Sequence, residues 1–292
     1  MKILTPATSA NLGPGFDTLG LALDFFNEVE IKPFRVQTIS ILGEGFNKSF
    51  LKKNNTFVNI FNEIFLELTG EKQNFKFKFK NSIPFSRGLG SSSAVIVSAI
   101  ASAYKMAGFK IDKQIVLNRS LIYENHPDNI TPAVFGGFTC SIVEYDKVLF
   151  QKCDISDDIR AVVVIPTKSM GTKESRSKLP KKYTVAQCVN NISHASYLTA
   201  CFLTKNYNKL SFASKDMIHE DIRMESLPEL FDIRNLAYEN GALMSSLSGS
   251  GSSFLNIVYK DDAHKLKEIF IDKFPNFRVE IFSFQNDGII IN

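Results

Sequence analysis

The sequence predicts a protein of mixed helices and strands in about two domains. The chain has 292 residues, 44% of them hydrophobic, which is enough to bury a substantial core. Phe75 to Lys80 alternates phenylalanine with lysine, the pattern of a strand with one buried face. The small residues that follow Gly90 instead predict a helix over about Ser91 to Met106.

Composition excludes several classes of function. The net charge is +4, from 34 basic and 30 acidic residues, and the basic residues form no block with interleaved aromatics. Nucleic acid is therefore not an expected partner. No apolar run approaches the roughly 20 residues that a membrane span needs, so a membrane partner is not expected either. The four cysteines are far apart and form no CxxC pair, which favours a reduced, cytoplasmic protein.

A glycine- and serine-rich turn before the Ser91 helix is the strongest local signal for a ligand. Gly88 and Gly90 permit positive φ and close approach of a ligand to the backbone. The helix that follows would aim its free N–H groups and positive dipole end into the loop, which is typical of a phosphate site. The segment comprises Pro84, Phe85, Ser86, Arg87, Gly88, Leu89, Gly90, Ser91, Ser92, Ser93 and Ala94.

The N-terminal half alternates regular elements with two polar loops. A short strand over Lys2 to Leu4 precedes an irregular segment, Thr5 to Gly20, in which Asn11 and Asp17 are either turn-formers or ligands. A strand pair is expected over residues 28–34 and 36–42, with helices over 54–68 and 113–123. The second polar loop holds Glu124, His126, Asp128 and Asn129 before Gly136-Gly137, and these groups are costly to bury without a ligand or metal.

The second half begins after a polar stretch, and we place the domain boundary at 155, giving domains 1–155 and 156–292. Strands are expected over residues 161–165, 252–258 and 278–284, and helices over 185–202 and 263–272. Two arginines, Arg176 and Arg223, are either solvated surface charges or a bidentate clamp for a carboxylate.

Six segments together resemble the homoserine kinases, a family of the GHMP small-molecule kinases. They are the Pro6 to Asp17 string, the Pro84 to Ala94 loop, His-x-Asp-Asn from His126 to Gly137, the two arginine segments around Thr172 and Asp216, and Leu-Ser-Gly-Ser-Gly at 247–251. The resemblance covers nearly the whole chain in the family's order. Other GHMP branches carry a catalytic Asp where this chain has Asn129, and a Lys near its Thr8 or Ser9, which favours the homoserine branch.

The resemblance implies an α+β fold of two domains, the first like ribosomal S5 domain 2 and the second ferredoxin-like. It implies transfer of the γ-phosphate of ATP to the hydroxyl of L-homoserine, with ATP and Mg²⁺ as cofactors and a site between the domains. It leaves the oligomeric state open, a homodimer included.

Residue roles follow from the same resemblance. The Pro84 to Ala94 loop and Asn59 would bind ATP, Asn59 beside the adenine, although Asn59 is otherwise a surface position of its helix. Ser92 and Glu124 would hold Mg²⁺. The substrate pocket would comprise Asn11, Asp17, His126, Asn129, Thr172, Arg176 and Arg223. Asn129 and Arg176 are the catalytic candidates, and Asn129 should orient the hydroxyl, since an amide cannot take its proton.

Two other functions fit the same motifs. Another GHMP kinase acting on a different small alcohol is the nearer alternative. A non-catalytic nucleotide-binding regulator on the same scaffold is the more distant one.

Overall fold

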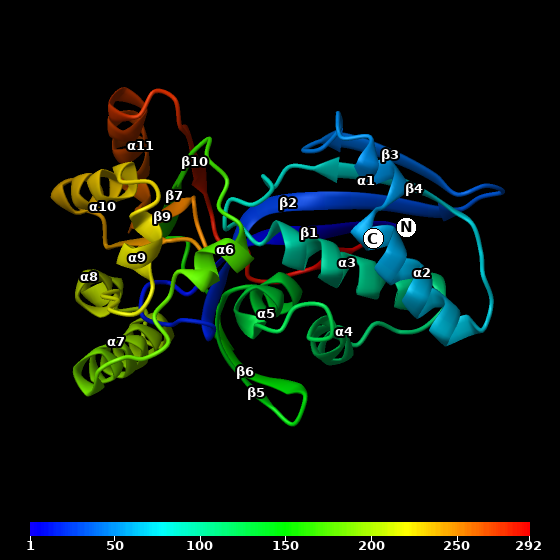
Figure 1. Ribbon diagram of the computed structural model, residues 1–292, viewed down its shortest axis with the longest axis horizontal. Coiled ribbons are helices and arrows are strands. Elements are labelled where there is room, and N and C mark those ends of the chain that lie inside the picture. The colour runs from blue at the N-terminus through cyan, green and yellow to red at the C-terminus, as the bar shows by residue number, and fades with distance from the viewer.

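The computed structural model describes residues 1–292 and contains two sheets, each covered by helices (Figure 1). The first sheet has seven strands in the order β11-β1-β2-β4-β3, with the β5–β6 hairpin attached to β2. Its strands are β1 (Lys2–Ala10), β2 (Leu19–Pro33), β3 (Thr38–Gly43), β4 (Phe75–Asn81), β5 (Phe138–Glu144), β6 (Lys147–Cys153) and β11 (Ile290–Ile291).

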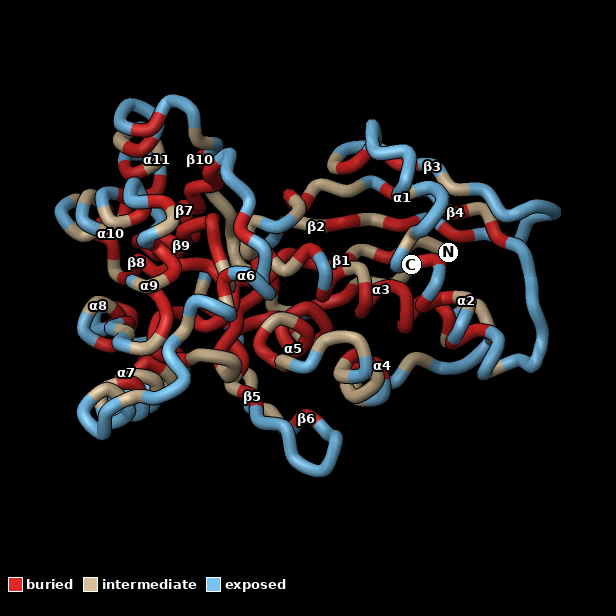
Figure 2. Tube along the Cα trace, in the orientation of Figure 1, coloured by how far each residue is buried: buried red, intermediate tan, exposed pale blue.

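Four helices cover one face of this sheet and close the first core (Figures 1 and 2). They are α2 (Thr56–Thr69), α3 (Ser91–Met106), α4 (Lys113–Ser120) and α5 (Pro127–Phe135), while the short α1 (Phe50–Lys53) follows β3. The alternation of β4 is confirmed, because Phe75, Phe77 and Phe79 are buried. They meet the rings of Phe57 and Phe61 on α2 edge to face, a favourable geometry for aromatic pairs.

Two details of the predicted first sheet are wrong. β1 does not end at Leu4 but continues to Ala10, because a register shift between Pro6 and Ala7 lets the strand pass a proline that lacks an N–H donor. Strands β2 and β3 do not pair with each other; β4 lies between them, antiparallel to β2 and parallel to β3. The phenylalanine-rich β4 thereby gains a central position, where its apolar face is fully covered.

The second sheet has the ferredoxin-like order. Its four antiparallel strands, β7 (Ile159–Ile165), β8 (Met244–Leu247), β9 (Phe254–Tyr259) and β10 (Arg278–Phe282), lie in the order β10-β7-β9-β8. One helical crossover, α11 (Ala263–Lys273), joins β9 to β10. The other contains α6 (Thr172–Ser177), α7 (Val185–Leu203), α8 (Leu210–Ala213), α9 (Glu220–Met224) and α10 (Glu229–Glu239). None of the helices is long and apolar enough to cross a membrane.

The C-terminal residues return to the first sheet. Beyond β10, Phe284 forms an isolated bridge with Leu23 of β2. β11 then pairs with β1, which places the two chain ends side by side (Figure 1). β6 ends at Cys153 in the first sheet and β7 begins at Ile159 in the second. The boundary at 155 stays a prediction, and the last residues of the chain belong with the first sheet by their pairing.

Candidate active site

A polar cavity lies where the loops of the two sheets meet. Polar side chains and glycines make up almost all of its lining, and they come from both halves of the chain. The lining comprises Asn11, Asp17, Pro84, Ser86, Arg87, Gly88, Leu89, Gly90, Ser91, Ser92, Ser93, Glu124, His126, Asp128, Asn129, Thr172, Arg176, Arg223, Gly249 and Ser250.

The N-terminus of α3 forms one wall of the cavity. Gly90 is the residue before the helix and has φ 65°, a left-handed conformation that favours glycine. The amide of Ala94 is the first to bond within the helix, to the Gly90 carbonyl. The amides of Ser91, Ser92 and Ser93 therefore have no partner inside the helix, and free amides of this kind favour an anion.

The two loop glycines also permit close packing. A Cβ at Gly88 would lie 1.9 Å from the Ser248 carbonyl oxygen, and one at Gly90 would lie 1.9 Å from the Thr8 hydroxyl oxygen. The Ser248 hydroxyl donates to the Gly88 carbonyl at 2.6 Å. The loop after β8 thus packs directly against the glycine- and serine-rich turn.

Arg87 points out of the turn. Its Nε donates to the Pro166 carbonyl at 2.9 Å, and its other nitrogens bond the carbonyls of Phe85 and Thr167. Arg87 therefore fixes the turn to the end of β7, and its charge is engaged by main-chain oxygens.

Asn129 and Asp128 also line the cavity, and Asn129 lies close to Gly90. The Thr8 hydroxyl donates to the Asn129 side-chain oxygen at 2.7 Å, and the Asn129 amide lies 3.3 Å from Asp128 Oδ1. Asp128 is buried, and burial, followed by the negative charges of Asp17 and Glu124, raises its pKa to about 7. These two bonds fix the orientation of the Asn129 side chain, with its oxygen toward Thr8 and its NH₂ group toward Asp128.

Asp17 and Arg176 form an ion pair across the cavity. The Arg176 guanidinium donates to both Asp17 oxygens, at 2.9 and 2.7 Å. Asp17 is held in place by its own amide, which donates to the Asn11 side chain at 3.0 Å, and His126 Nδ1 lies 3.4 Å from Asp17 Oδ2. Burial lowers the pKa of His126, against the opposing effect of Asp17.

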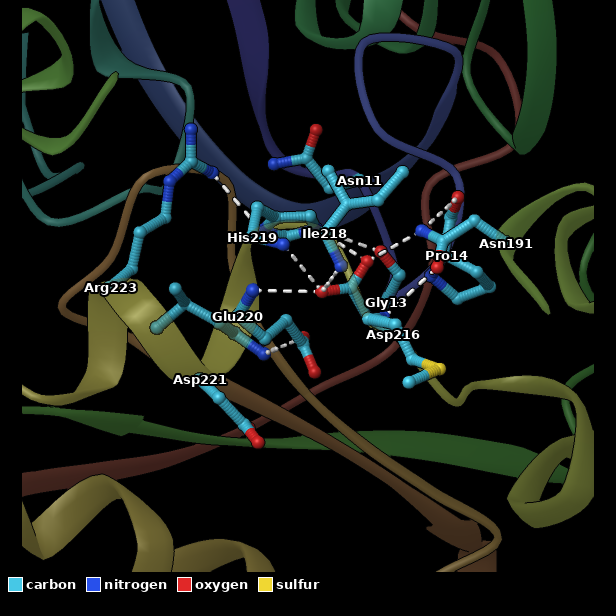
Figure 3. A network of polar contacts seen from close by, with 12 residues as sticks. Asn11, Gly13, Pro14, Asn191, Asp216, Ile218, His219, Glu220, Asp221 and Arg223 are labelled. Carbon is cyan, nitrogen blue, oxygen red and sulfur yellow. Dashed lines mark hydrogen bonds and ion pairs between the residues drawn. The ribbon is translucent and has the colours of Figure 1, made fainter. Parts of the chain in front are cut away.

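Arg223 is fixed beside this pair by a buried network, drawn in Figure 3. Its guanidinium donates to the Gly249 carbonyl at 3.1 Å and lies 3.2 Å from His219 Nδ1. His219 Nε2 in turn lies 2.8 Å from the Gly13 carbonyl, so the ring donates there and accepts from Arg223. Burial is the main cause that lowers the pKa of His219 to about 4, which keeps this ring neutral.

Asp216 anchors that network at the start of α9. Its Oδ2 accepts from the amides of Ile218, His219 and Glu220, as a helix-capping carboxylate does (Figure 3). Its Oδ1 accepts from Asn191 of α7 at 2.6 Å. The arginine segments, which the sequence leaves open as surface charges, are thus parts of the cavity wall.

Glu124 is the carboxylate nearest the serines of α3. It is half-buried, and burial raises its pKa, while Arg176 and the Ser93 hydroxyl lower it. Of the three serines, Ser92 is exposed to the cavity and Ser91 and Ser93 are buried. No group of three or more His, Cys, Asp or Glu side chains forms a metal cluster. A cation here would be bound by one carboxylate, one hydroxyl and the oxygens of a phosphate, as Mg²⁺ is in many kinases.

A second cavity adjoins the first and shares Ser86, Ser91 and Ser92 with it. Half of its lining is hydrophobic, and Phe85 lies here instead of in the polar cavity. Asn59 does not line it: this side chain is exposed on α2 and bonds Asn54. Asn55 and Thr56, one turn earlier, face the cavity, which corrects the expectation for Asn59.

The polar cavity brings together every predicted substrate residue, both predicted metal ligands and nine of the eleven loop residues. Besides Phe85, the exception is Ala94, which is buried in α3. Sequence reasoning assigned no role to Asp128, Gly249 or Ser250. Asp128 stands in the His126 to Gly137 motif, and Gly249 and Ser250 stand in the motif at 247–251. The carboxyl group of the first motif and the glycine turn of the second were the signals that could have identified them.

Comparison with known families places the chain among phosphotransferases. Residues 55–137 match the GHMP kinases N terminal domain, and residues 203–276 match the GHMP kinases C terminal domain. The first match includes the glycine- and serine-rich turn, α3 and α5.

Individual relatives are more specific. The chain is 63% identical to a homoserine kinase of Campylobacter concisus, over 99% of this chain and 98% of the relative. It is 58% identical to that of Campylobacter jejuni, over the whole of both. Among solved structures, a homoserine kinase from Cytophaga hutchinsonii has a TM-score of 0.88 at 27% identity, covering 99% of this chain and 96% of that one. The mevalonate kinase of Methanococcus jannaschii, at 16% identity and 98% coverage of both chains, shares the fold with a TM-score of 0.74.

Proposed function

This chain belongs to the homoserine kinase family of the GHMP kinases, and from that premise we propose how its cavity performs the reaction. The enzyme uses ATP to phosphorylate the side-chain hydroxyl of L-homoserine, which gives O-phospho-L-homoserine in threonine biosynthesis. The observation that carries the proposed mechanism is that an anion-binding helix start and a paired Asp17–Arg176 line the same cavity.

The triphosphate would bind at the α3 terminus. Residues 88–92 line the cavity at the start of α3, and the helix dipole favours negative charge there. The adjoining, more apolar cavity suits the adenine ring, with Phe85 as an aromatic surface and Asn55 and Thr56 as polar groups at its edge. Asn59 is not part of this proposal.

Mg²⁺ would be held by Ser92 and Glu124. The two residues line the same cavity, and hard oxygen donors are what this ion prefers. When bound, Mg²⁺ supplies positive charge that neutralises the phosphate oxygens. Burial raises the pKa of Glu124 because it destabilises the charged carboxylate. A bound cation would offset that cost.

The Asp17–Arg176 pair would recognise the zwitterionic end of homoserine. An amino acid carries both a carboxylate and an ammonium group, so it can insert between the two side chains and give each an opposite charge. Arg176 and the buried Arg223 would bind the carboxylate and Asp17 the ammonium group or the hydroxyl. Asn11, His126 and Thr172 would border the same pocket.

Asn129 would orient the hydroxyl that attacks the phosphate. Its side-chain oxygen is already occupied by the Thr8 hydroxyl, and its amide cannot accept a proton. We propose that no side-chain base takes part and that the proton leaves to the transferred phosphate. Phosphoryl transfer depends mainly on positioning and charge neutralisation, which this site provides.

The test is a coupled ADP-release assay with L-homoserine, L-threonine, L-serine and mevalonate. Selective turnover of homoserine is expected, since it has both a zwitterionic end and a primary hydroxyl on a longer side chain than serine. Faster turnover of mevalonate would favour another GHMP kinase. ATP binding without ADP release from any of the four would favour a nucleotide-binding regulator.

Glu124→Gln tests the metal proposal. We expect a higher Mg²⁺ concentration at half-maximal rate with the KM for homoserine little changed. An unchanged Mg²⁺ requirement would remove Glu124 from the metal site.

A cytoplasmic location stays a prediction that rests on four free, widely spaced cysteines.

A further inference from the structure

Thr8 is a fully buried residue of β1 that lies beside the starts of α3 and α5. Its amide donates to the Leu89 carbonyl at 3.2 Å, which joins β1 to the glycine- and serine-rich turn. Thr8 itself lines neither the polar cavity nor the more apolar one beside it. Any effect of its side chain on the reaction must therefore pass through a neighbouring residue.

That neighbour is Asn129, which does line the polar cavity. The Thr8 hydroxyl lies 2.7 Å from the Asn129 side-chain oxygen, and this is the only hydrogen bond that the Thr8 side chain makes. Both oxygens lie close to Gly90, since a Cβ there would be 1.9 Å from the Thr8 oxygen and 3.2 Å from the Asn129 oxygen. The contact is thus packed against the residue that precedes α3.

The neighbours of Asn129 determine which end of its amide points where. A hydroxyl can donate or accept, so Thr8 alone would fit either end. An ionised carboxylate only accepts, so Asp128 Oδ1, at 3.3 Å, fits the NH₂ end. The oxygen then points to Thr8, whose hydroxyl donates to it. One N–H of Asn129 has no partner in the chain and is available to a group in the cavity.

This orientation decides what Asn129 can do for a substrate hydroxyl. The free N–H can donate to the hydroxyl oxygen of homoserine, which leaves the hydroxyl proton free to point toward the γ-phosphate. A flipped amide would instead accept that proton in a hydrogen bond and hold it away from the phosphate. In the transfer, the hydroxyl oxygen bonds to the γ-phosphorus while the bond to ADP breaks, and the proton passes to an oxygen of the transferred phosphate.

We infer that Thr8 is a positioning residue for phosphoryl transfer, because its hydroxyl holds the Asn129 amide with an N–H, and not the oxygen, available to the substrate hydroxyl. The inference rests on the proposed function, in which Asn129 orients that hydroxyl. Thr8 affects the rate of the chemical step and leaves the affinity for either substrate unchanged, since it lines neither cavity.

The first test replaces the Thr8 hydroxyl. Thr8→Val keeps the branched shape that suits a strand but leaves the Asn129 oxygen without its donor, so the amide can turn over. We expect kcat to fall at least about fivefold, while the KM values for ATP and homoserine change less than about twofold. Thr8→Ala, a second variant without the hydroxyl, should behave alike. Thr8→Ser keeps the hydroxyl and should restore kcat to within about twofold.

Thr5→Val is the matched control. Thr5 is also a fully buried residue of β1, but its hydroxyl has no hydrogen-bond partner and it lines neither cavity. The same substitution on the same strand should therefore leave kcat unchanged. Melting curves followed by circular dichroism check that each variant folds.

The second test asks whether Thr8 acts through Asn129. Thr8→Val is combined with Asn129→Ala, and the kcat of the double variant is compared with that of Asn129→Ala alone. Without the amide there is nothing for Thr8 to hold. The added substitution should therefore lower kcat by less than about twofold.

Several results would overturn the inference. They are an unchanged kcat in Thr8→Val, no recovery in Thr8→Ser, or an equal loss in Thr5→Val. An undiminished effect of Thr8→Val on top of Asn129→Ala, or a loss explained by a higher KM for ATP, would mean that Thr8 supports the turn instead.

The same variants separate this inference from the proposed function. If Asn129→Ala keeps the original kcat, Asn129 does not orient the hydroxyl and the proposed function is wrong at that residue. If Asn129→Ala lowers kcat and Thr8→Val does not, the proposed function stands and only the role of Thr8 is rejected.

Discussion

The guanidinium of Arg176 donates two hydrogen bonds, of 2.9 and 2.7 Å, to the carboxylate of Asp17, although 159 residues separate them in sequence. Arg176 lies on α6 and Asp17 in the loop between β1 and β2, so the pair joins the two lobes across the cavity. Bidentate pairs of this kind are geometrically specific. In the proposed substrate pocket, this pair therefore holds two opposite charges in place, which a zwitterionic amino acid can match.

Replacing Arg176 should separate the two substrates. Arg176→Ala removes a charge-assisted contact to the homoserine carboxylate, worth about 1.5–3 kcal/mol, so we expect the KM for homoserine to rise roughly 10- to 150-fold. The KM for ATP should change little. Arg278→Ala, at an arginine exposed on β10 and paired with Glu280, is the control. Equal increases in both KM values would place Arg176 outside the amino-acid pocket.

Asn129 tests whether a side-chain base exists. Asn129→Asp should lower kcat, since it adds a carboxylate next to buried Asp128 and opposite phosphate. Rates measured across pH should show no new acidic limb. If Asn129→Ala abolished activity while Asn129→Asp raised it with a new acidic pKa, the proposal of a base-free reaction would be wrong. Asp128→Asn is the companion variant, because a limb near pH 7 that vanishes in it would identify Asp128 as the base.

A methyl group at Gly90 should damage ATP binding. In Gly90→Ala the new Cβ would meet the Thr8 hydroxyl, so the start of α3 must shift and displace its free amides. We expect the KM for ATP to rise by at least about tenfold. Gly70→Ala is a close control, because Gly70 also has positive φ, 74°, but has nothing within 4 Å of the added Cβ. That variant should lose only about 1 kcal/mol of stability and keep its ATP affinity.

Glu220 should make the protein less stable as the pH rises. Burial, then the charge of Asp216, raises the pKa of this carboxyl to about 8 from its ordinary 4.5. Between these two values the folded chain holds a proton that the unfolded chain has lost, so increasing pH favours unfolding. Glu220→Gln cannot ionise and keeps an acceptor for the Leu247 amide, which bonds Glu220 at 2.7 Å.

The measurement is urea unfolding of both proteins from about pH 5 to about pH 9. Relative to the original chain, Glu220→Gln should gain stability with pH, by a few kcal/mol at most. Glu229→Gln, at an exposed glutamate of α10, should show no such trend. A constant difference across the range would mean that Glu220 is not held protonated.

Local patterns in the sequence determined much of what was predicted. The extent of α3 follows from a glycine turn and a run of small residues, and β4 follows from strict alternation with phenylalanine. The motifs also identified polar residues that the fold brings to one cavity, since each motif places its polar groups on one loop. Such patterns depend only on residues close together in the sequence, so they can be recognised without knowing the fold.

Long-range features were beyond that reasoning. The order of β2, β4 and β3 depends on which strand has the most apolar face to cover, and the pairing of β11 with β1 joins opposite ends of the chain. The burial of Arg223 depends on Asp216, His219 and Asn191, which are polar residues that satisfy one another only once folded. Asn59 lies one turn further along α2 than Asn55 and Thr56, and there its side chain bonds Asn54 and is exposed to solvent instead of lining the cavity.

The return of the chain after β10 affects how the lobes can move. Two separate connections cross between them, residues 154–158 on the way out and residues 283–289 on the way back. Two tethers resist swivelling of one lobe about a single strand, while they still permit a hinge-like rocking that widens or narrows the mouth. Such a motion would let Asp17 and Arg176 separate to admit an amino acid and then pair again in the same geometry.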